Sequence, residues 1–219
     1  MARTGADLEG LSRLAKWTRL FLVATIAISL IAFPAGLLHR YLTFETNVPF
    51  WIIDLLELTV WSLRLGLIVP AGVIFLLWFH RAWETLEDLR TQGLSFSPEF
   101  AAGSFFIPLV NLVVPFQAMR ELYNRSAGED VHQANADVGD ATAWWACALG
   151  AFGVNGFLWF QDWFNSNGLV FIQAHWLIEM AMDLLAAVLI AGAGWFLMGL
   201  VQDITREQTK LAGSSQTFA

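Results

Sequence analysis

The chain has 219 residues, of which 57% are hydrophobic and 14% are charged, and its formal net charge is -7. Soluble domains average about half apolar and a quarter charged residues, so this composition excludes an ordinary soluble domain and favours a single integral membrane domain. The negative charge argues against a nucleic-acid partner, and a lone cysteine, Cys147, excludes internal disulfides and thiolate metal clusters.

Four runs with few or no charges are long enough to cross a hydrocarbon core, which needs about 20 helical residues. The first follows Arg13, Lys16 and Arg19 and resembles a signal peptide, but it is longer than the apolar region of a cleaved signal. We therefore expect an uncleaved first span. In the fourth span, Gly192 and Gly194 are expected to let helices approach closely. The predicted spans are 20–38, 58–79, 141–160 and 184–201.

Arg64 is the one charge inside the second predicted span. A charge within a span faces the bundle interior or snorkels to the interface. If Phe79 marks the inner edge of the bilayer, Arg64 lies about 6 Å below the outer edge at 1.5 Å per residue. Glu57 on the same helix and Asp183 at the outer end of the fourth span are its two candidate partners. Our hypothesis is that Arg64 pairs with Asp183.

A fifth uncharged run, 100–119, contains the stretch FFIPLVNLVVPFQAM. Ser97, Pro98 and the acid that follows them form a typical helix start. Pro108 and Pro115 each remove a backbone donor, so the segment between them is expected to be irregular, with the Asn111 amide bonding freed carbonyls. Irregular backbone cannot face lipid. We therefore expect residues 98–127 to form a proline-broken elbow, re-entrant or interfacial, that does not cross the membrane.

The distribution of basic residues supports this topology. If the elbow does not cross, ten of the twelve basic residues share one side, whereas a crossing elbow would divide them almost evenly. Because Lys and Arg concentrate in cytoplasmic loops, both termini are expected to be cytoplasmic, in the plasma membrane of the cell. The ten residues are Arg3, Arg13, Lys16, Arg19, Arg81, Arg90, Arg120, Arg125, Arg206 and Lys210.

The segments around the elbow have simpler patterns. Residues 81–92 are expected to extend the second helix, which Gly93 would end in the C′ position. After Pro115 the pattern is amphipathic, with Gln117, Arg120, Glu121 and Arg125 on the polar face of a helix at the membrane surface. Residues 126–140 are small, polar and acidic, which is typical of a flexible linker.

Several of these features together resemble the DUF4328 family of bacterial membrane proteins. They are the block WFHRA at 78–82, the stretch FIPLVNLVVP at 106–115, the tryptophan pair that opens the third span, and DITREQ at 203–208. The resemblance covers about residues 65–208 and implies an all-α, four-span fold in the bacterial inner membrane, with no established activity. The residues that match the family pattern are Trp78, Arg81, Gly93, Pro98, Pro108, Asn111, Pro115, Trp144 and Trp145.

Motifs for chemistry are scarce. The sequence has no phosphate-binding loop, dinucleotide glycine pattern, nucleophile elbow or zinc-protease motif, so we expect no enzyme and no cofactor. His175, Glu179 and Asp183 share one helix face by their spacing and form a candidate site for a divalent cation. A solvated helix face is the competing interpretation.

Two functions remain open. The first is a non-enzymatic scaffold, regulator or partner-binding membrane subunit whose partners are the lipid bilayer and a second copy or another membrane protein. The alternative is a small transporter or channel subunit in which Arg64 and the outer carboxylates line an outward-facing polar cavity.

Overall fold

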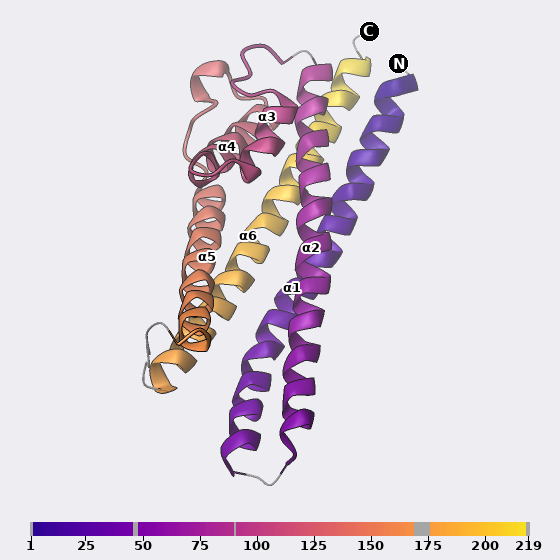
Figure 1. Cartoon of the computed structure of the whole chain (residues 1–219). Helices are drawn as coiled ribbons and strands as arrows, with labels where there is room; N and C mark the ends of the chain where they lie inside the picture. The colour runs from indigo at the N-terminus through magenta and orange to yellow at the C-terminus, as the bar shows by residue number, and fades with distance from the viewer. Residues whose placement is uncertain (1, 46–47, 90, 169–175, 218–219) are drawn as a thin grey trace.

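The structure is a computed structural model that describes residues 2–45, 48–89, 91–168 and 176–217. Over these residues it is helical and contains no strand. Four helices are long and apolar enough to cross a membrane, and each contains one of the predicted spans. The all-α, four-span prediction is therefore confirmed (Figure 1). The four helices are α1 (Ala2–Glu45), α2 (Phe50–Asp88), α5 (Gly139–Ser166) and α6 (Trp176–Thr217).

The proline-broken segment folds as an elbow at one end of the bundle. Figure 1 shows this elbow at the same end as both termini, called the elbow end below, while α1 meets α2 and α5 meets α6 at the opposite, hairpin end. The elbow stays at the elbow end and does not run the length of the bundle, which agrees with the sequence prediction. Its elements, with the turn that follows, are α3 (Pro98–Gly103), η1 (Ser104–Phe106), η2 (Val110–Leu112), α4 (Val114–Ser126) and η3 (Val131–Gln133).

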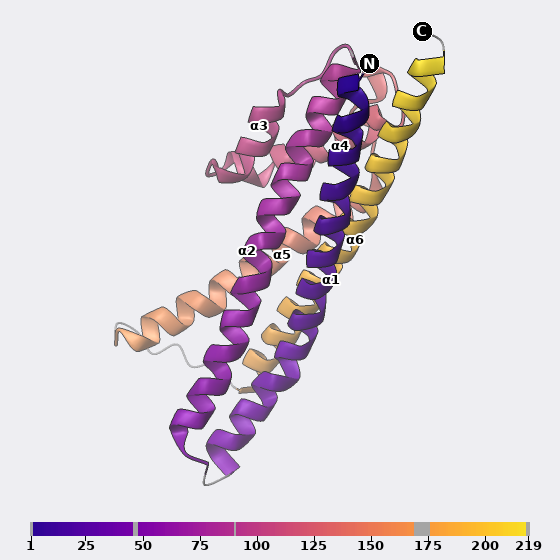
Figure 2. The ribbon, with the colours of Figure 1, turned by 90° about the vertical axis from the view of Figure 1, so that its right-hand side faces the viewer.

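Helix α6 is the centre of the packing. It contacts both α1 and α5 extensively, and α1 also packs along α2. A Cβ on Gly194 would lie 2.8 Å from Ile26 Cγ1 of α1, and a Cβ on Gly192 would lie 3.1 Å from Cys147 Sγ of α5. The expected role of these glycines in close helix packing is confirmed. Helix α5 instead leans away from α2 toward the hairpin end (Figure 2).

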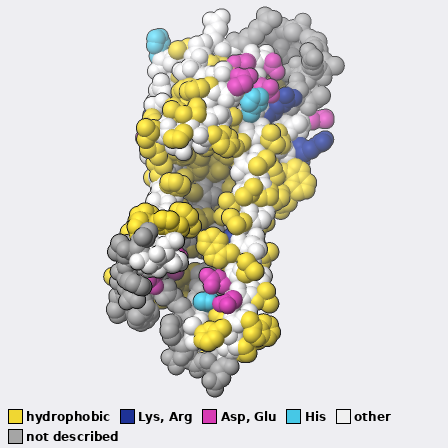
Figure 3. All heavy atoms as spheres, viewed as in Figure 1, with side chains coloured by type: hydrophobic (Ala, Val, Ile, Leu, Met, Phe, Trp, Pro, Cys, Tyr) yellow, Lys and Arg dark blue, Asp and Glu magenta, His cyan; other side chains and the backbone are white. Residues whose placement is uncertain are grey.

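The outer surface of the spans is apolar. Large side chains such as Leu65, Val69 and Trp195 are more than half exposed, and hydrophobic atoms cover much of the face in Figure 3. A soluble protein rarely exposes so large an apolar surface, whereas lipid covers it without cost.

The connection after α2 differs from the sequence prediction. Helix α2 ends at Asp88, because the Thr91 N–H bonds back to the Leu86 carbonyl and closes the last turn. Gly93 is therefore outside the C′ position and belongs to the following turn, where its φ is +74°. A Cβ there would also lie 2.8 Å from Val131 Cγ2, so both the backbone conformation and the close approach of residues 126–140 favour glycine.

Candidate functional site

The elbow turns sharply at Leu109. Its φ is +67°, and the Val110 N–H bonds to the Pro108 carbonyl at 2.8 Å, which together make a strained γ-turn. Pro98 occupies the first turn of α3, as predicted, and the Ser97 hydroxyl accepts the Phe100 N–H at 3.3 Å. Pro115 occupies the first turn of α4. The prolines thus set where the elbow helices begin and where the chain reverses.

Trp145, and not Asn111, donates the side-chain hydrogen bond that holds the elbow. The Trp145 indole N–H donates to the Leu112 carbonyl at 2.9 Å, from the second turn of α5. The Asn111 side chain makes no hydrogen bond to any described residue, and its backbone N–H bonds to the Ile107 carbonyl at 2.9 Å. The expectation that the Asn111 amide bonds freed carbonyls is therefore wrong, because an indole from a neighbouring helix reaches the open carbonyl instead.

An aromatic cluster packs the elbow against the helices of the bundle. The Phe105 ring packs edge-on against Phe75 at 5.7 Å, Phe79 at 5.8 Å and Trp145 at 6.3 Å between ring centroids. Phe75 also meets Trp144 of α5 at 6.1 Å. These contacts place the elbow tip beside the ends of the second and third predicted spans.

Part of the polar face of α4 is buried, contrary to the sequence prediction, while Gln117 and Arg120 are half-buried. Glu121 is 0% exposed and Arg125 is 8% exposed. Glu121 Oε1 accepts the Ser95 N–H at 2.8 Å, and the Arg125 guanidinium donates to the carbonyls of Gln92 and Glu129. Polar groups can be buried when they are hydrogen-bonded, and here the partners are backbone groups of the two loops that flank α3 and α4.

Two further side chains complete what we call the elbow polar cluster, consisting of Glu121, Asn124, Arg125 and Gln208. The Asn124 amide donates to the carbonyls of Ala134 and Ala136, both at 3.0 Å, and so fastens the segment after α4. Gln208 of α6 is 0% exposed and donates to the Ala82 carbonyl and the Ser126 hydroxyl, both at 2.9 Å. The cluster thereby joins α2, α4 and α6.

Five side-chain atoms of α2, α4 and α6 at this end are buried without a hydrogen bond to any described residue: the Trp83 indole nitrogen, Arg120 Nε, Glu121 Oε2, Arg125 Nε and Gln208 Oε1. Each buried polar group without a hydrogen bond lowers the free energy of unfolding by about 1–3 kcal/mol, so these groups are not explained by a contribution to stability.

The family-pattern residues gather at the elbow end. Trp78 is 0% exposed and its indole N–H donates to Thr205 Oγ1 at 3.1 Å, while Arg81 pairs with Glu84 at 2.9 Å. The others lie in the elbow, in the turn before it or in the first turns of α5. Sequence reasoning found this end from its prolines and tryptophans, but it missed Asn124 and Gln208.

The hairpin end carries a second set of polar residues. Arg64 is partly buried, its guanidinium lies 5.6 Å from the centre of the Trp61 ring, and the charge of Asp183 acts on it. Glu57 pairs instead with His39 of α1 at 3.3 Å, which makes it a less suitable partner for Arg64. The pairing of Arg64 with Asp183 stays a hypothesis.

The structure describes two of the three candidate cation ligands, Glu179 and Asp183. Glu179 Oε1 accepts the Gln161 amide at 3.1 Å, which links α5 to α6, and His175 lies outside the described residues. Among the described residues, no three His, Cys, Asp or Glu side chains come together as a metal site. The set of His175, Glu179 and Asp183 stays a prediction.

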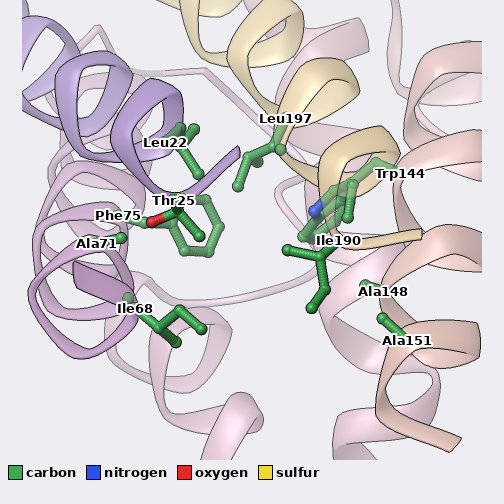
Figure 4. A pocket seen from close by; sticks show the side chains of 13 residues that line it. Leu22, Thr25, Ile68, Ala71, Phe75, Trp144, Ala148, Ala151, Ile190 and Leu197 are labelled. Carbon is green, nitrogen blue, oxygen red and sulfur yellow. The ribbon is translucent and has the colours of Figure 1, made fainter. Parts of the chain in front are cut away.

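A cavity of about 280 Å³ lies among the four long helices. Figure 4 shows Ile68, Ala71 and Phe75 on one side of it and Ala148 and Ala151 on the other. The molecular surface is hollowed between α5 and α2 (Figure 3). Thirteen residues, nearly all of them apolar, line the cavity: Leu22, Thr25, Ile68, Ala71, Gly72, Phe75, Trp144, Ala148, Ala151, Ile190, Ala193, Gly194 and Leu197.

Comparison with known proteins gives one match. The model of the DUF4328 family, described as a domain of unknown function, matches residues 45–206. No curated protein and no solved structure matches the chain.

Proposed function

Since the chain belongs to the DUF4328 family, a family of unknown function, we propose from its structure that it is a non-enzymatic membrane protein whose elbow end binds a membrane partner. In this role it serves as a scaffold, a regulator or a partner-binding subunit. It needs no cofactor and no nucleic acid.

The observation that carries this proposal is the rigid presentation of an apolar elbow tip. Phe106 is 75% exposed and Leu109 is 79% exposed. Leu109 stands in a strained γ-turn, and strain of this kind persists only where the surroundings enforce it and clusters at functional sites. The Trp145 hydrogen bond and the elbow polar cluster provide that enforcement, so a partner would meet an ordered surface and would not have to order it.

The elbow end is proposed to face the cytoplasm, in the cytoplasmic membrane of a bacterium. Both termini and the elbow lie at that end, which therefore holds the sequence segments that carry ten of the twelve basic residues. Short loops rich in Lys and Arg remain on the cytoplasmic side.

Site-specific photo-crosslinking tests the partner-binding proposal. A photoreactive phenylalanine analogue replaces Leu109 in membranes of the native host, and Leu65, which is 54% exposed on a span, is the matched control position. We expect a discrete protein adduct at Leu109 that is absent at Leu65. Lipid adducts alone at both positions would contradict the proposal.

One observation favours the alternative of a small transporter or channel subunit. The charges of Arg64 and Asp183 act on each other across α2 and α6. Against it, the cavity among the four helices is lined almost entirely by apolar side chains, which give a charged solute no path.

A double-mutant cycle of Arg64→Leu and Asp183→Leu measures the contribution of this pair to stability in detergent. If the two charges form a functional buried pair, each single change strands a charge and the double change restores much of the loss. Strictly additive effects would mean that Arg64 only snorkels, and the transporter alternative would lose its main support.

A further inference from the structure

The apolar cavity continues into a polar rim on α2. Ile68, Ala71 and Phe75 line the cavity at intervals of three and four residues, which places them on one face of the helix. Arg64 precedes Ile68 by four residues and lies on the same face, one turn closer to the hairpin end. The cavity wall on α2 therefore ends at a guanidinium.

The neighbouring helices show the same change from apolar to polar. On α5, Asn155 follows the lining residue Ala151 by four residues and donates to its carbonyl at 2.7 Å. On α6, Asp183 precedes the lining residue Ile190 by seven residues. Three helices thus present an apolar cavity whose hairpin-side continuation is polar, which is the pattern that an amphipathic ligand needs.

Arg64 has unused hydrogen-bonding capacity. Its guanidinium makes no hydrogen bond and no ion pair within 4 Å to any described residue, although it lies inside a span and is partly buried. The Asp183 carboxylate acts on the guanidinium only from beyond 4 Å, so its donors remain open to an anion with several acceptor oxygens, and phosphate fits their planar arrangement.

The chemistry of the site favours a phospholipid over a protein helix, because the lining of the cavity is apolar and its hairpin-side continuation carries a guanidinium. The distance along α2 from Arg64 to Phe75 is about 16 Å, which offers an extended acyl chain a continuous apolar face. A lipid with its head group at Arg64 would extend one chain along this face toward Phe75.

We propose that this site binds one phospholipid of the hairpin-side leaflet, with its phosphate on Arg64 and one acyl chain in the cavity between α2 and α5. The molecular surface is hollowed between α5 and α2 (Figure 3), so one acyl chain enters the cavity sideways from the bilayer. This site is separate from the elbow tip and does not depend on the partner-binding proposal.

Native mass spectrometry of the purified full chain in mild detergent tests the site. The two probes are dioleoyl phosphatidylethanolamine and dioleoylglycerol, which share their acyl chains and differ by the phosphate head group. Arg64→Met removes the guanidinium but not the cavity. Gly72 lines the cavity and a Cβ there meets nothing within 4 Å, so the side chain in Gly72→Leu can occupy the cavity. Gly66→Leu is the matched control on the same helix, because its Cβ is equally unobstructed but Gly66 does not line the cavity.

We expect wild type to retain one phosphatidylethanolamine per chain. Arg64→Met should weaken its binding about 10-fold, as expected for a lost charged hydrogen bond, and leave dioleoylglycerol unchanged. Gly72→Leu should weaken both lipids and Gly66→Leu neither. Equal binding of both lipids to wild type, or equal retention by all variants, would overturn the proposal. So would a lipid-free wild-type dimer that Gly72→Leu dissociates, since a protein helix would then occupy the cavity. If Gly72→Leu does not fold, the Arg64→Met comparison alone decides.

Discussion

Replacing Trp145 with phenylalanine should loosen the elbow without unfolding the bundle. The change keeps an aromatic ring against Phe105 but removes the 2.9 Å hydrogen bond to the Leu112 carbonyl. A neutral hydrogen bond of this kind contributes about 0.5–1.5 kcal/mol net. At about 1 kcal/mol, the population of the open elbow rises about five-fold, since RT is about 0.6 kcal/mol.

Hydrogen exchange of the elbow amides in detergent, followed by mass spectrometry, measures this opening directly. The amides of residues 110–113 bond to carbonyls within the elbow, so their exchange reports on its integrity. We expect about five-fold faster exchange in Trp145→Phe. Asn111→Leu, at a side chain with no hydrogen bond to the described residues, should change exchange by less than about two-fold. Faster exchange in Asn111→Leu than in Trp145→Phe would refute the assignment of the elbow contact to Trp145.

Three further substitutions test local features. Asn124→Leu leaves two carbonyls of the segment after α4 without their donor, so a protease specific for acidic residues should cut this segment about 10-fold faster, whereas Gln133→Leu on the exposed side should not. Gly194→Leu forces a side chain against Ile26 and should lower stability in detergent by about 1–3 kcal/mol, while Gly199→Leu, with open space at its Cβ, should be tolerated. Leu109→Gly should remove about 1–2 kcal/mol of backbone strain at the positive φ and lose about 0.5–1 kcal/mol through the higher chain entropy of the unfolded state. The net effect is stabilising, so the Val110 amide should exchange more slowly. Faster exchange would contradict the strain at this position.

The sequence predicted the features that depend on local composition or on the number of basic residues in each segment. Apolar run lengths located the four spans, and the count of basic residues identified the elbow as a segment that does not cross. The helix start at Ser97 and Pro98 was also predictable, because an N-cap needs only neighbouring residues.

The contacts that fix the elbow were not predictable because their partners are distant backbone groups. Arg125 bonds to the carbonyl of Gln92, 33 residues away, and Glu121 to the N–H of Ser95, 26 residues away. An amphipathic pattern separates polar from apolar faces, but it does not distinguish water from a loop carbonyl as the partner of the polar face. The cavity was likewise hidden, since it depends on how far α5 leans from α2.

The orientation of the elbow end relative to the membrane is tested most directly by labelling single cysteines on intact cells with an impermeant thiol reagent. In a Cys147→Ala background, His132→Cys reports on the elbow end and Asn167→Cys on the hairpin end, and both side chains are exposed. We expect Asn167→Cys to be labelled on intact cells and His132→Cys only after permeabilisation. Labelling of His132→Cys on intact cells would place the elbow outside the cell and contradict the proposed topology.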